Sequence, residues 1–292
     1  MLSREALREH TKYNDRYFPI NLFRIKSNSV QPLFIHWHDS IEIVHWTKGQ
    51  ALFSIGGTEF PAEPGDLFCV SSGQIHSAAR QYEGPTAYNA MVFNPVLLMG
   101  QTPDPSYMKH LAPFLDGSRR LPPKLSIDDP QWDQARFLMN RILAEFEKSQ
   151  AGYELSVKAY LTLLLVEMAR SGIVQGAVGG KNTQEGYLEN FKTLLLHIEK
   201  NYAEKLTVEQ AARMVGLSPF HFCKTFKRLT GRTFVEFINL HRVNKAEALL
   251  TDSPLSITEI AEATGFCNIN YLDRVFKKYK LKSPSELRRP GR

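Results

Sequence analysis

The chain has 292 residues, of which 43% are hydrophobic and 23% are charged, a balance typical of a globular protein with room for two domains. It has no run of about 18 apolar residues, its start is too charged and polar for a secretory signal, and Cys69, Cys223 and Cys267 form no CxxC pair. These features disfavour a membrane protein, a disulfide framework and a cysteine-type zinc finger. They predict a cytoplasmic protein with no membrane partner.

The positive charge is concentrated in the last third of the chain. Residues from Tyr187 to the end contain 18 basic and 11 acidic residues, a balance of +7, whereas residues 1–186 contain 18 basic and 19 acidic residues. A basic module beside a neutral module predicts a polyanionic partner for the basic one. A merely basic surface would give the same balance, so charge alone leaves both interpretations open.

Residues from about 20 to 95 are predicted to form β-strands. Short apolar or alternating runs are separated by turn signals such as Gly56-Gly57. The clearest runs are Ile41–Trp46, Ala51–Ile55, Leu67–Val70 and Tyr88–Phe93. Strands at this even spacing are typical of a barrel or a sandwich, and Gly56-Gly57 fits a two-residue hairpin turn.

Two helices are predicted after an irregular, proline-rich stretch at residues 100–127. The first begins near Asp129-Pro130, and the second runs from about Glu154 to Arg170. The second helix is apolar over much of its circumference, so one face is expected to pack on the strands. Its other face either packs within the same chain or pairs with a second subunit, and we expect a homodimer.

Residues 172–186 are rich in glycine and polar residues and predict a flexible linker between an N-terminal domain, 1–171, and a C-terminal domain, 187–292. The C-terminal domain carries explicit helix-start signals, which predict about seven helices. The signals of capping-box form are Thr207-x-x-Gln210, Thr233-x-x-Glu236, Ser256-x-x-Glu259 and Ser283-x-x-Glu286.

The C-terminal domain also contains an internal repeat. Residues 206–217 resemble residues 255–266, and after one inserted residue Phe222–Lys227 matches Leu272–Lys277. Each copy has the pattern of a helix, a short glycine-containing turn and a second helix, which is the helix-turn-helix signature. A long predicted helix from about Thr233 to Leu250 joins the copies. Its length of about 27 Å suits two recognition helices placed about one DNA turn apart.

Residues 187–289 resemble the DNA-binding domain of AraC/XylS-type transcription regulators. The residues that carry the resemblance are Ser218, Phe226-Lys227, Gly231, Arg242, Ala246, Leu249-Leu250, Ile257, Ile260-Ala261, Gly265-Phe266, Arg274, Phe276-Lys277 and Ser283-Pro284. The resemblance implies a sequence-specific regulator that binds double-stranded DNA, is not an enzyme, and acts with RNA polymerase, as an activator in our expectation.

The resemblance also assigns DNA contacts by position. In the first recognition helix the candidates are Phe220, Cys223, Lys224 and Lys227; in the second they are Ile269, Asn270, Tyr271, Arg274, Lys277 and Lys278. Asn270 could read adenine, and Arg274 could read guanine or contact a phosphate. Each lysine is a candidate phosphate contact, with a simple solvated face as the alternative.

Two residues depart from the pattern in the second copy. Leu281 stands where the first copy has Gly231, a helix-end position that favours glycine, so either the helix ends differently or the leucine is strained. Asp273 places an acidic group on the second recognition helix, where it could accept a hydrogen bond from cytosine or from a nearby lysine.

A histidine-rich pattern occurs in the predicted β-domain. His36-Trp37-His38 is followed by Glu42, and His76 follows Gly73 by three residues. These spacings resemble the two cupin motifs, although Ser71 and Arg80 stand where proline and asparagine are usual. His36 and His38 project to one face of a strand because its side chains alternate. The resemblance implies a set of three histidines and one carboxylate, which suits zinc, iron, manganese or nickel.

Three interpretations of His36, His38, Glu42 and His76 stay open: a divalent-metal site, a polar lining for a sugar-like small-molecule effector, and hydrogen-bonded structural histidines. Trp46 is a candidate stacking surface for the effector. A metal-dependent cupin enzyme carrying a DNA-binding module is the alternative function. The predicted fold class is α+β, with an N-terminal cupin-like β-barrel, two following helices, and an all-α domain of two helix-turn-helix units.

Overall fold

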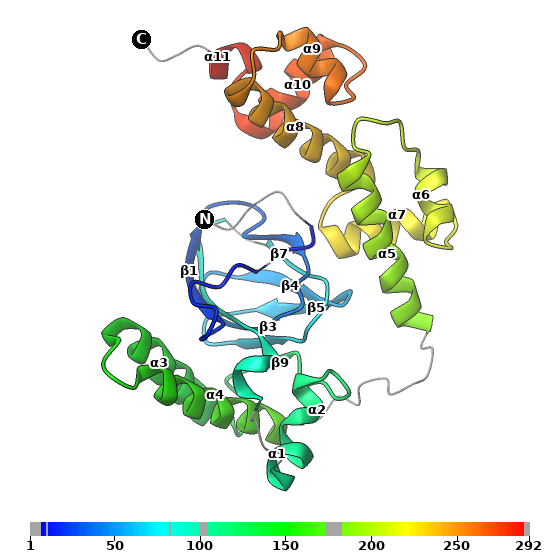
Figure 1. Cartoon of the computed structure of the whole chain (residues 1–292). Helices are drawn as coiled ribbons and strands as arrows, with labels where there is room; N and C mark the ends of the chain where they lie inside the picture. Colours follow the sequence, from blue (N-terminus) through cyan, green and yellow to red (C-terminus); the bar gives the residue numbers. More distant parts are fainter. Residues whose placement is uncertain (1–6, 10, 82, 100–103, 173–182, 289–292) are drawn as a thin grey trace. The chain divides into compact units, whose positions relative to one another are not determined.

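The computed structural model describes residues 7–9, 11–81, 83–99, 104–172 and 183–288, with the backbone alone for 183–187 (Figure 1). Its contacts divide the chain into two compact units, one spanning Arg8–Thr183 and the other holding the chain from Gln184 onward. Within the described ranges, no helix is both long enough and apolar enough to cross a membrane.

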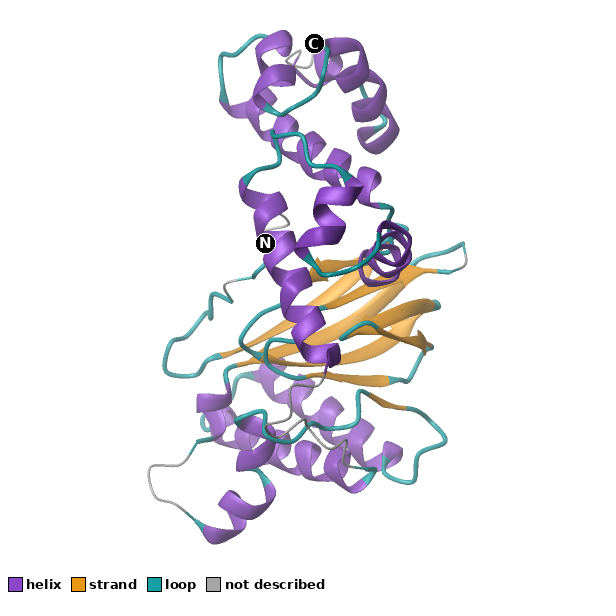
Figure 2. Cartoon of the chain, turned by 90° about the vertical axis from the view of Figure 1, so that its right-hand side faces the viewer, coloured by secondary structure: helices purple, strands orange, loops and turns teal. Residues whose placement is uncertain are grey.

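The N-terminal unit is built on two antiparallel sheets, drawn in orange in Figure 2. One sheet has the order β1-β8-β3-β6-β9 and the other has the order β2-β7-β4-β5. The strands are β1 (Ile20–Ser27), β2 (Leu33–His36), β3 (Ile41–Lys48), β4 (Ala51–Ile55), β5 (Thr58–Ala62), β6 (Leu67–Val70), β7 (His76–Arg80), β8 (Thr86–Phe93) and β9 (Lys124–Leu125). The four clearest predicted runs are confirmed as β3, β4, β6 and β8. The predicted Gly56-Gly57 hairpin turn is also confirmed, since both residues have positive φ.

Alternation along the strands of the five-stranded sheet separates two hydrophobic cores. In β3, Ile41 and Ile43 face the core shared with the helices, whereas Val44 and Trp46 face the core between the two sheets. Side chains on opposite faces of a strand alternate, so Glu42 shares the inner face with Val44 and Trp46. This parity places a carboxylate between the sheets.

Helices cover the outer face of the five-stranded sheet (Figure 1). The two predicted helices are confirmed as α3 (Trp132–Lys148) and α4 (Tyr153–Arg170). The stretch predicted as irregular contains short elements instead, because proline is tolerated in the first turn of a helix. Short elements from residue 95 onward are η1 (Pro95–Leu98), α1 (Pro105–His110), α2 (Ala112–Leu115) and the two-residue β9.

Over residues 183–288 the C-terminal unit is helical, and the prediction of about seven helices is confirmed there. They are α5 (Thr183–Lys200), α6 (Val208–Met214), α7 (Pro219–Thr230), α8 (Phe234–Asp252), α9 (Ile257–Ala263), α10 (Ile269–Lys280) and α11 (Pro284–Arg288). The capping boxes at Thr207, Thr233 and Ser256 form as predicted. At Ser283, the backbone N–H of Glu286 donates to the serine hydroxyl and the Ser283 N–H donates to the Glu286 carboxylate.

The predicted linker differs from the structure at its C-terminal end. Residues 173–182 lie outside the described residues, and α5 already begins at Thr183. Residues 183–186 of the predicted linker are therefore helical. Gly186 suggests a linker in the sequence, but one glycine costs a helix only about 1 kcal/mol relative to alanine.

Candidate functional site

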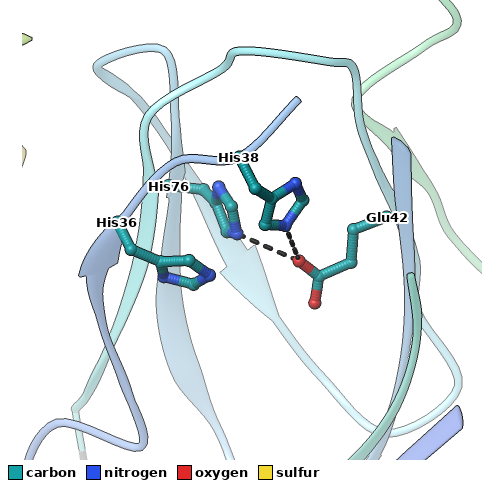
Figure 3. Close-up of side chains that lie close together, drawn as sticks. All are labelled: His36, His38, Glu42 and His76. Carbon is teal, nitrogen blue, oxygen red and sulfur yellow. Dashed lines mark hydrogen bonds and ion pairs between the residues drawn. The ribbon is translucent and has the colours of Figure 1, made fainter. Parts of the chain in front are cut away.

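A cluster of three histidines and one glutamate lies between the two sheets (Figure 3). His36 ends β2 and pairs in register with His76, the first residue of β7. Glu42 comes from β3 of the other sheet, and His38 lies in the loop that connects β2 to β3. Their nitrogen and oxygen donor atoms all lie within 4.8 Å of one another. The structure therefore brings together the four side chains that the sequence spacing grouped.

Hydrogen bonds to the backbone orient each imidazole in the cluster. The Nδ1 atoms of His36, His38 and His76 lie 2.8, 3.0 and 2.9 Å from the carbonyl oxygens of Phe34, Ser40 and Gln74. Since a carbonyl oxygen only accepts, each Nδ1 must carry the proton and donate it. In a neutral ring this leaves the Nε2 lone pair free and directed at the interior of the cluster.

The Glu42 carboxylate is the centre of the cluster. Its Oε2 atom lies 3.1 Å from His38 Nε2 and 3.0 Å from His76 Nε2 (Figure 3). Burial raises the pKa of Glu42, but its hydrogen bonds with the two imidazoles outweigh burial, so the pKa is lowered overall. Burial lowers the pKa of His38, but the hydrogen bond and attraction of Glu42 raise it overall. The carboxylate is therefore held in its charged form.

His36 lies at the outer edge of the cluster and differs from the other two histidines. Burial, reinforced by repulsion from His76, lowers the pKa of His36 to about 3. The His36 ring is therefore neutral near pH 7, with its proton on Nδ1. Its Nε2 lone pair faces Glu9, whose Oε2 lies 3.6 Å away. Burial raises the pKa of Glu9. The sequence analysis missed Glu9, which precedes the first strand and belongs to no recognisable spacing.

The donor set and its spacing fit a divalent transition-metal ion. Donors bound to one ion at about 2.1 Å lie about 3.0 to 4.2 Å apart, depending on geometry, and the cluster approaches these separations. Metal-bound histidines commonly donate their second ring N–H to a carbonyl or carboxylate, as these three do. His36, His38, Glu42 and His76 could therefore hold the ion, and imidazole with carboxylate suits iron, manganese, nickel or zinc.

Trp46, the candidate stacking residue, lies in the aromatic core between the sheets. It is fully buried, and its ring stacks on Tyr88 with centroids 5.1 Å apart. Its indole N–H donates to the carbonyl oxygen of Gly49. Because this N–H is the only polar group of tryptophan, none is left to orient an effector. Beside Trp46, the rings of Phe53 and Phe68 stack on each other with centroids 4.6 Å apart, so aromatic side chains fill much of the space between the sheets.

The first helix-turn-helix unit, α6 and α7, presents an exposed recognition helix. Ser218 caps α7 by accepting a hydrogen bond from the His221 N–H. The predicted core residues Phe222 and Phe226 are fully buried. The predicted contact residues Phe220, Cys223, Lys224 and Lys227 are all exposed. Phe220 is 75% exposed.

The second unit, α9 and α10, presents Ile269, Asn270 and Arg274 to solvent. The Arg274 guanidinium lies 5.1 Å from the centre of the Tyr271 ring, a cation–π arrangement. Tyr271 is only partly exposed, and its hydroxyl accepts a hydrogen bond from Asn239 of α8. In the free protein Tyr271 therefore anchors α10 to the connecting helix.

Carboxylates neutralise two of the predicted phosphate contacts in the free protein. Lys277 Nζ lies 2.9 Å from Asp273 one helical turn away, and both side chains are exposed. Lys278 Nζ lies 3.5 Å from Glu236 of α8. Of the two partners that the sequence left open for Asp273, the structure contains the nearby lysine.

The connecting helix α8 contacts both units. Phe234 packs on Phe222 and Phe226 of the first unit, with ring centroids 5.2 and 5.3 Å apart. The Tyr279 hydroxyl of the second unit donates to the Glu236 carbonyl oxygen of α8. Two helix-turn-helix units thus share one rigid element about 28 Å long.

Paired helix-turn-helix units with exposed basic recognition helices define a DNA-binding transcription regulator. Residues 22–165 match the family model of the AraC-like ligand binding domain, and residues 211–290 match that of a helix-turn-helix domain. The chain is 24% identical to the uncharacterized HTH-type transcriptional regulator YdeC of Bacillus subtilis, over 94% of this chain and 93% of that protein. It belongs to the AraC family, as a DNA-binding regulator with an N-terminal ligand-binding domain.

Two further similarities span most of the chain. The HTH-type transcriptional activator RhaS of Escherichia fergusonii is 25% identical over 87% of this chain and 86% of that protein. The structure of unsaturated fatty acid-bound ToxT from Vibrio cholerae covers 91% of this chain and 93% of its own, at 14% identity and a TM-score of 0.33.

Proposed function

We propose that the N-terminal domain binds a divalent transition-metal ion at His36, His38, Glu42 and His76, and that occupancy of this site controls operator binding by α7 and α10. The carrying observation is the orientation of the three imidazoles. Each Nδ1 donates to a backbone carbonyl, which leaves Nε2 for the interior of the cluster. Nε2 of His38 and Nε2 of His76 lie 3.1 and 3.0 Å from the buried Glu42 carboxylate. The family's ligand-binding domain supports a regulatory role for whatever occupies the site.

Burial of the cluster favours the binding of a cation. His38, Glu42 and His76 are almost fully buried, and a buried charge is costly unless it is paired or coordinates a metal. Without an ion, Nε2 of His38 and Nε2 of His76 both lie against the same carboxylate oxygen, at 3.1 and 3.0 Å. An ion among the four donors would take up one ligand atom from each residue and would offset the Glu42 charge.

A sugar-like effector is the second candidate, and the geometry supports it less. Such a ligand needs a concave, partly polar space, whereas Trp46, Phe53 and Phe68 occupy much of the region between the sheets. The outer edge of the cluster at His36 is the place where a small molecule could still reach the ion. The two relatives named above, which match most of the chain, carry the names of transcriptional regulators, and this supports a sensory role over metal-dependent catalysis.

On the DNA side, we propose that Asn270 and Arg274 read base edges in the major groove and that Lys224, Lys227, Lys277 and Lys278 contact phosphates. Exposed Phe220 and Ile269 could contact thymine methyl groups. The shared helix α8 supports a fixed spacing of the two recognition helices on one duplex, which would demand operators with two half-sites about one helical turn apart.

We also propose that the regulator is a homodimer that acts with RNA polymerase as an activator. Leu155, Ala159 and Leu163 form an exposed stripe at i, i+4 and i+8 on α4, and Leu155 is 73% exposed. Such a stripe on one helix face is the pattern of a helix–helix interface. The activator role rests on the name of RhaS.

Metal uptake by the full-length chain tests the proposed site. Purified protein is stripped with a chelator, titrated separately with Mn(II), Fe(II), Ni(II) and Zn(II), and assayed for bound metal by mass spectrometry. We expect one ion per chain for the native sequence. His76→Ala should lower affinity at least about tenfold. His110→Ala, which removes an exposed histidine outside the cluster, is the matched control and should bind normally.

Two results would contradict the proposal. The first is a native chain that takes up none of the four ions. The second is equal uptake by the native chain, the His110→Ala chain and the His76→Ala chain, because binding would then lie elsewhere.

A further inference from the structure

We infer that Glu9 is a fifth ligand of this metal ion, supplied by the N-terminal segment 8–19, so that the ion ties this segment to the strands of the β-domain. The inference rests on the metal site proposed above. It adds a second carboxylate to the donor set, and it gives occupancy of the site a structural output outside the four-residue cluster.

The first argument is the position of Glu9. Its side chain is 16% exposed and that of His36 is 13% exposed, whereas the other three cluster residues are almost fully buried. Glu9 thus stands at the side of the cluster that faces solvent. The separation of 3.6 Å between Glu9 Oε2 and His36 Nε2 lies within the range of about 3.0 to 4.2 Å for two donors on one ion.

The second argument is the geometry of the contact between Glu9 and His36. His36 Nδ1 donates to the Phe34 carbonyl oxygen, which leaves Nε2 as the ring atom that faces Glu9 Oε2. At 3.6 Å the two atoms are also too far apart for a good hydrogen bond, which spans about 2.7–3.2 Å. A ring nitrogen and a carboxylate oxygen at this separation are spaced as two ligands of one ion would be.

The third argument is that the backbone holds the segment against the ligand-bearing residues. The Glu9 N–H donates to the carbonyl oxygen of Trp37, which stands between the ligands His36 and His38. Arg8 forms a parallel bridge with the same tryptophan, and its guanidinium lies 3.0 Å from Asp39.

Ser40, three residues after Trp37, makes a further contact with the N-terminal segment. The Tyr13 hydroxyl lies 2.6 Å from the Ser40 hydroxyl, and Ser40 also supplies the carbonyl oxygen that accepts the His38 Nδ1 proton. The segment therefore docks along the loop that carries the ligands. This docking places Glu9 beside the cluster, and a bound ion would add a further link between the segment and the loop.

A set of three imidazoles and two carboxylates changes the expected metal preference. Five donors suit an octahedral ion with one remaining position, whereas zinc prefers four ligands in a tetrahedron. Carboxylate oxygens favour manganese in particular. Glu9 should therefore matter more for Mn(II) than for Zn(II).

The test compares the full-length native chain with Glu9→Gln, Glu9→Asp and Glu59→Gln. Glu59 is exposed on β5, away from the cluster residues in the sequence. Glu59→Gln is therefore the matched control, because it also removes one carboxylate. Mn(II) affinity is measured by electron paramagnetic resonance and Zn(II) affinity by calorimetry. Hydrogen exchange of the peptide that contains Glu9 is measured with and without Mn(II). Circular dichroism checks that each variant is folded.

We expect Glu9→Gln to weaken Mn(II) binding about 10–100-fold and Zn(II) binding less. Mn(II) should slow exchange in the Glu9 peptide of the native and Glu59→Gln chains, and this protection should disappear in Glu9→Gln. Glu9→Asp, whose carboxylate is one methylene shorter, should also bind Mn(II) more weakly than the native chain.

Each negative outcome has a distinct meaning. If the native chain binds neither ion, the proposed metal site fails, and the role of Glu9 fails with it. If the native chain binds Mn(II) but Glu9→Gln binds it equally well and keeps the protection, the metal site stands and the fifth ligand is wrong. If Glu9→Asp equals the native chain while Glu9→Gln is weakened, Glu9 acts through charge at a distance and direct ligation is overturned.

Discussion

Replacing Leu281 with glycine should stabilise the second helix-turn-helix unit. Leu281 ends α10 in the left-handed conformation with φ of 59°, as Gly231 ends α7 with φ of 70°. This conformation costs a residue with a Cβ atom about 1–2 kcal/mol. The leucine side chain is 90% exposed, so its removal forfeits little packing. Glycine's extra freedom in the unfolded chain offsets about 0.5 kcal/mol, which leaves an expected net gain of about 1 kcal/mol.

Urea unfolding of the full-length chain can measure this gain. All three tryptophans, Trp37, Trp46 and Trp132, lie in the N-terminal unit, so their fluorescence follows that unit. Far-UV circular dichroism follows the helices. With a dependence of about 1–3 kcal/mol per molar urea, the dichroism midpoint attributable to the C-terminal unit should rise by about 0.3–1 M. The tryptophan midpoint should not move.

The controls separate strain from other effects of the substitution. Leu281→Ala keeps the Cβ atom and should gain little, whereas Gly231→Ala should destabilise the first unit by about 1 kcal/mol, because it creates the same strain there. Equal midpoints for Leu281→Gly and Leu281→Ala, or a loss of stability in Leu281→Gly, would refute the strain argument.

Three further predictions concern the DNA-binding unit. Arg274→Ala should weaken binding to an operator selected from random duplexes by about 1–3 kcal/mol, measured by fluorescence anisotropy, and should weaken binding to random DNA less. Equal losses of affinity for both DNAs would show that Arg274 does not read bases. Lys277→Ala should weaken binding to every duplex and reduce the slope of log affinity against log salt by about one, and an unchanged slope would exclude a phosphate contact. Burial, reinforced by Lys245, lowers the pKa of His241 to about 4. Below pH 6.5 His241 is therefore protonated in the unfolded chain but stays neutral in the folded chain. The free energy of unfolding should fall by up to about 3 kcal/mol as the pH drops to 4. His241→Gln should flatten the pH dependence of unfolding in this window, and identical pH profiles for the two chains would contradict the assignment.

Much of the C-terminal unit could be predicted from the sequence because its signals are local. A serine or threonine cap followed three residues later by glutamine or glutamate starts a helix through contacts within one turn. The repeat then predicted two similar units around one long helix. The predicted linker was wrong over residues 183–186, which belong to α5, because one glycine weakens a helix without ending it.

The contacts that join distant segments were less predictable. The cupin-like spacing was enough to group the four cluster residues, but the expectation that His36 and His38 share one strand face was wrong. His38 lies in the loop after β2, and Glu42 comes from β3 of the other sheet. Glu9 reaches the cluster only through its backbone bond to Trp37, which no spacing in the sequence reveals. The hydrogen bond between Asn239 and Tyr271 likewise depends on the packing of α8 against α10.

Coupling between the metal site and DNA is the most direct test of the account. The affinity of the full-length chain for its selected operator is measured by fluorescence anisotropy, at fixed salt, with Mn(II) and after chelation. For the native chain we expect the affinity to change at least about fivefold, the lower end of typical allosteric coupling. His76→Ala should show no change between the two conditions. A native chain that binds Mn(II) at the cluster yet holds the operator equally tightly in both conditions would contradict the proposal that this site controls DNA binding.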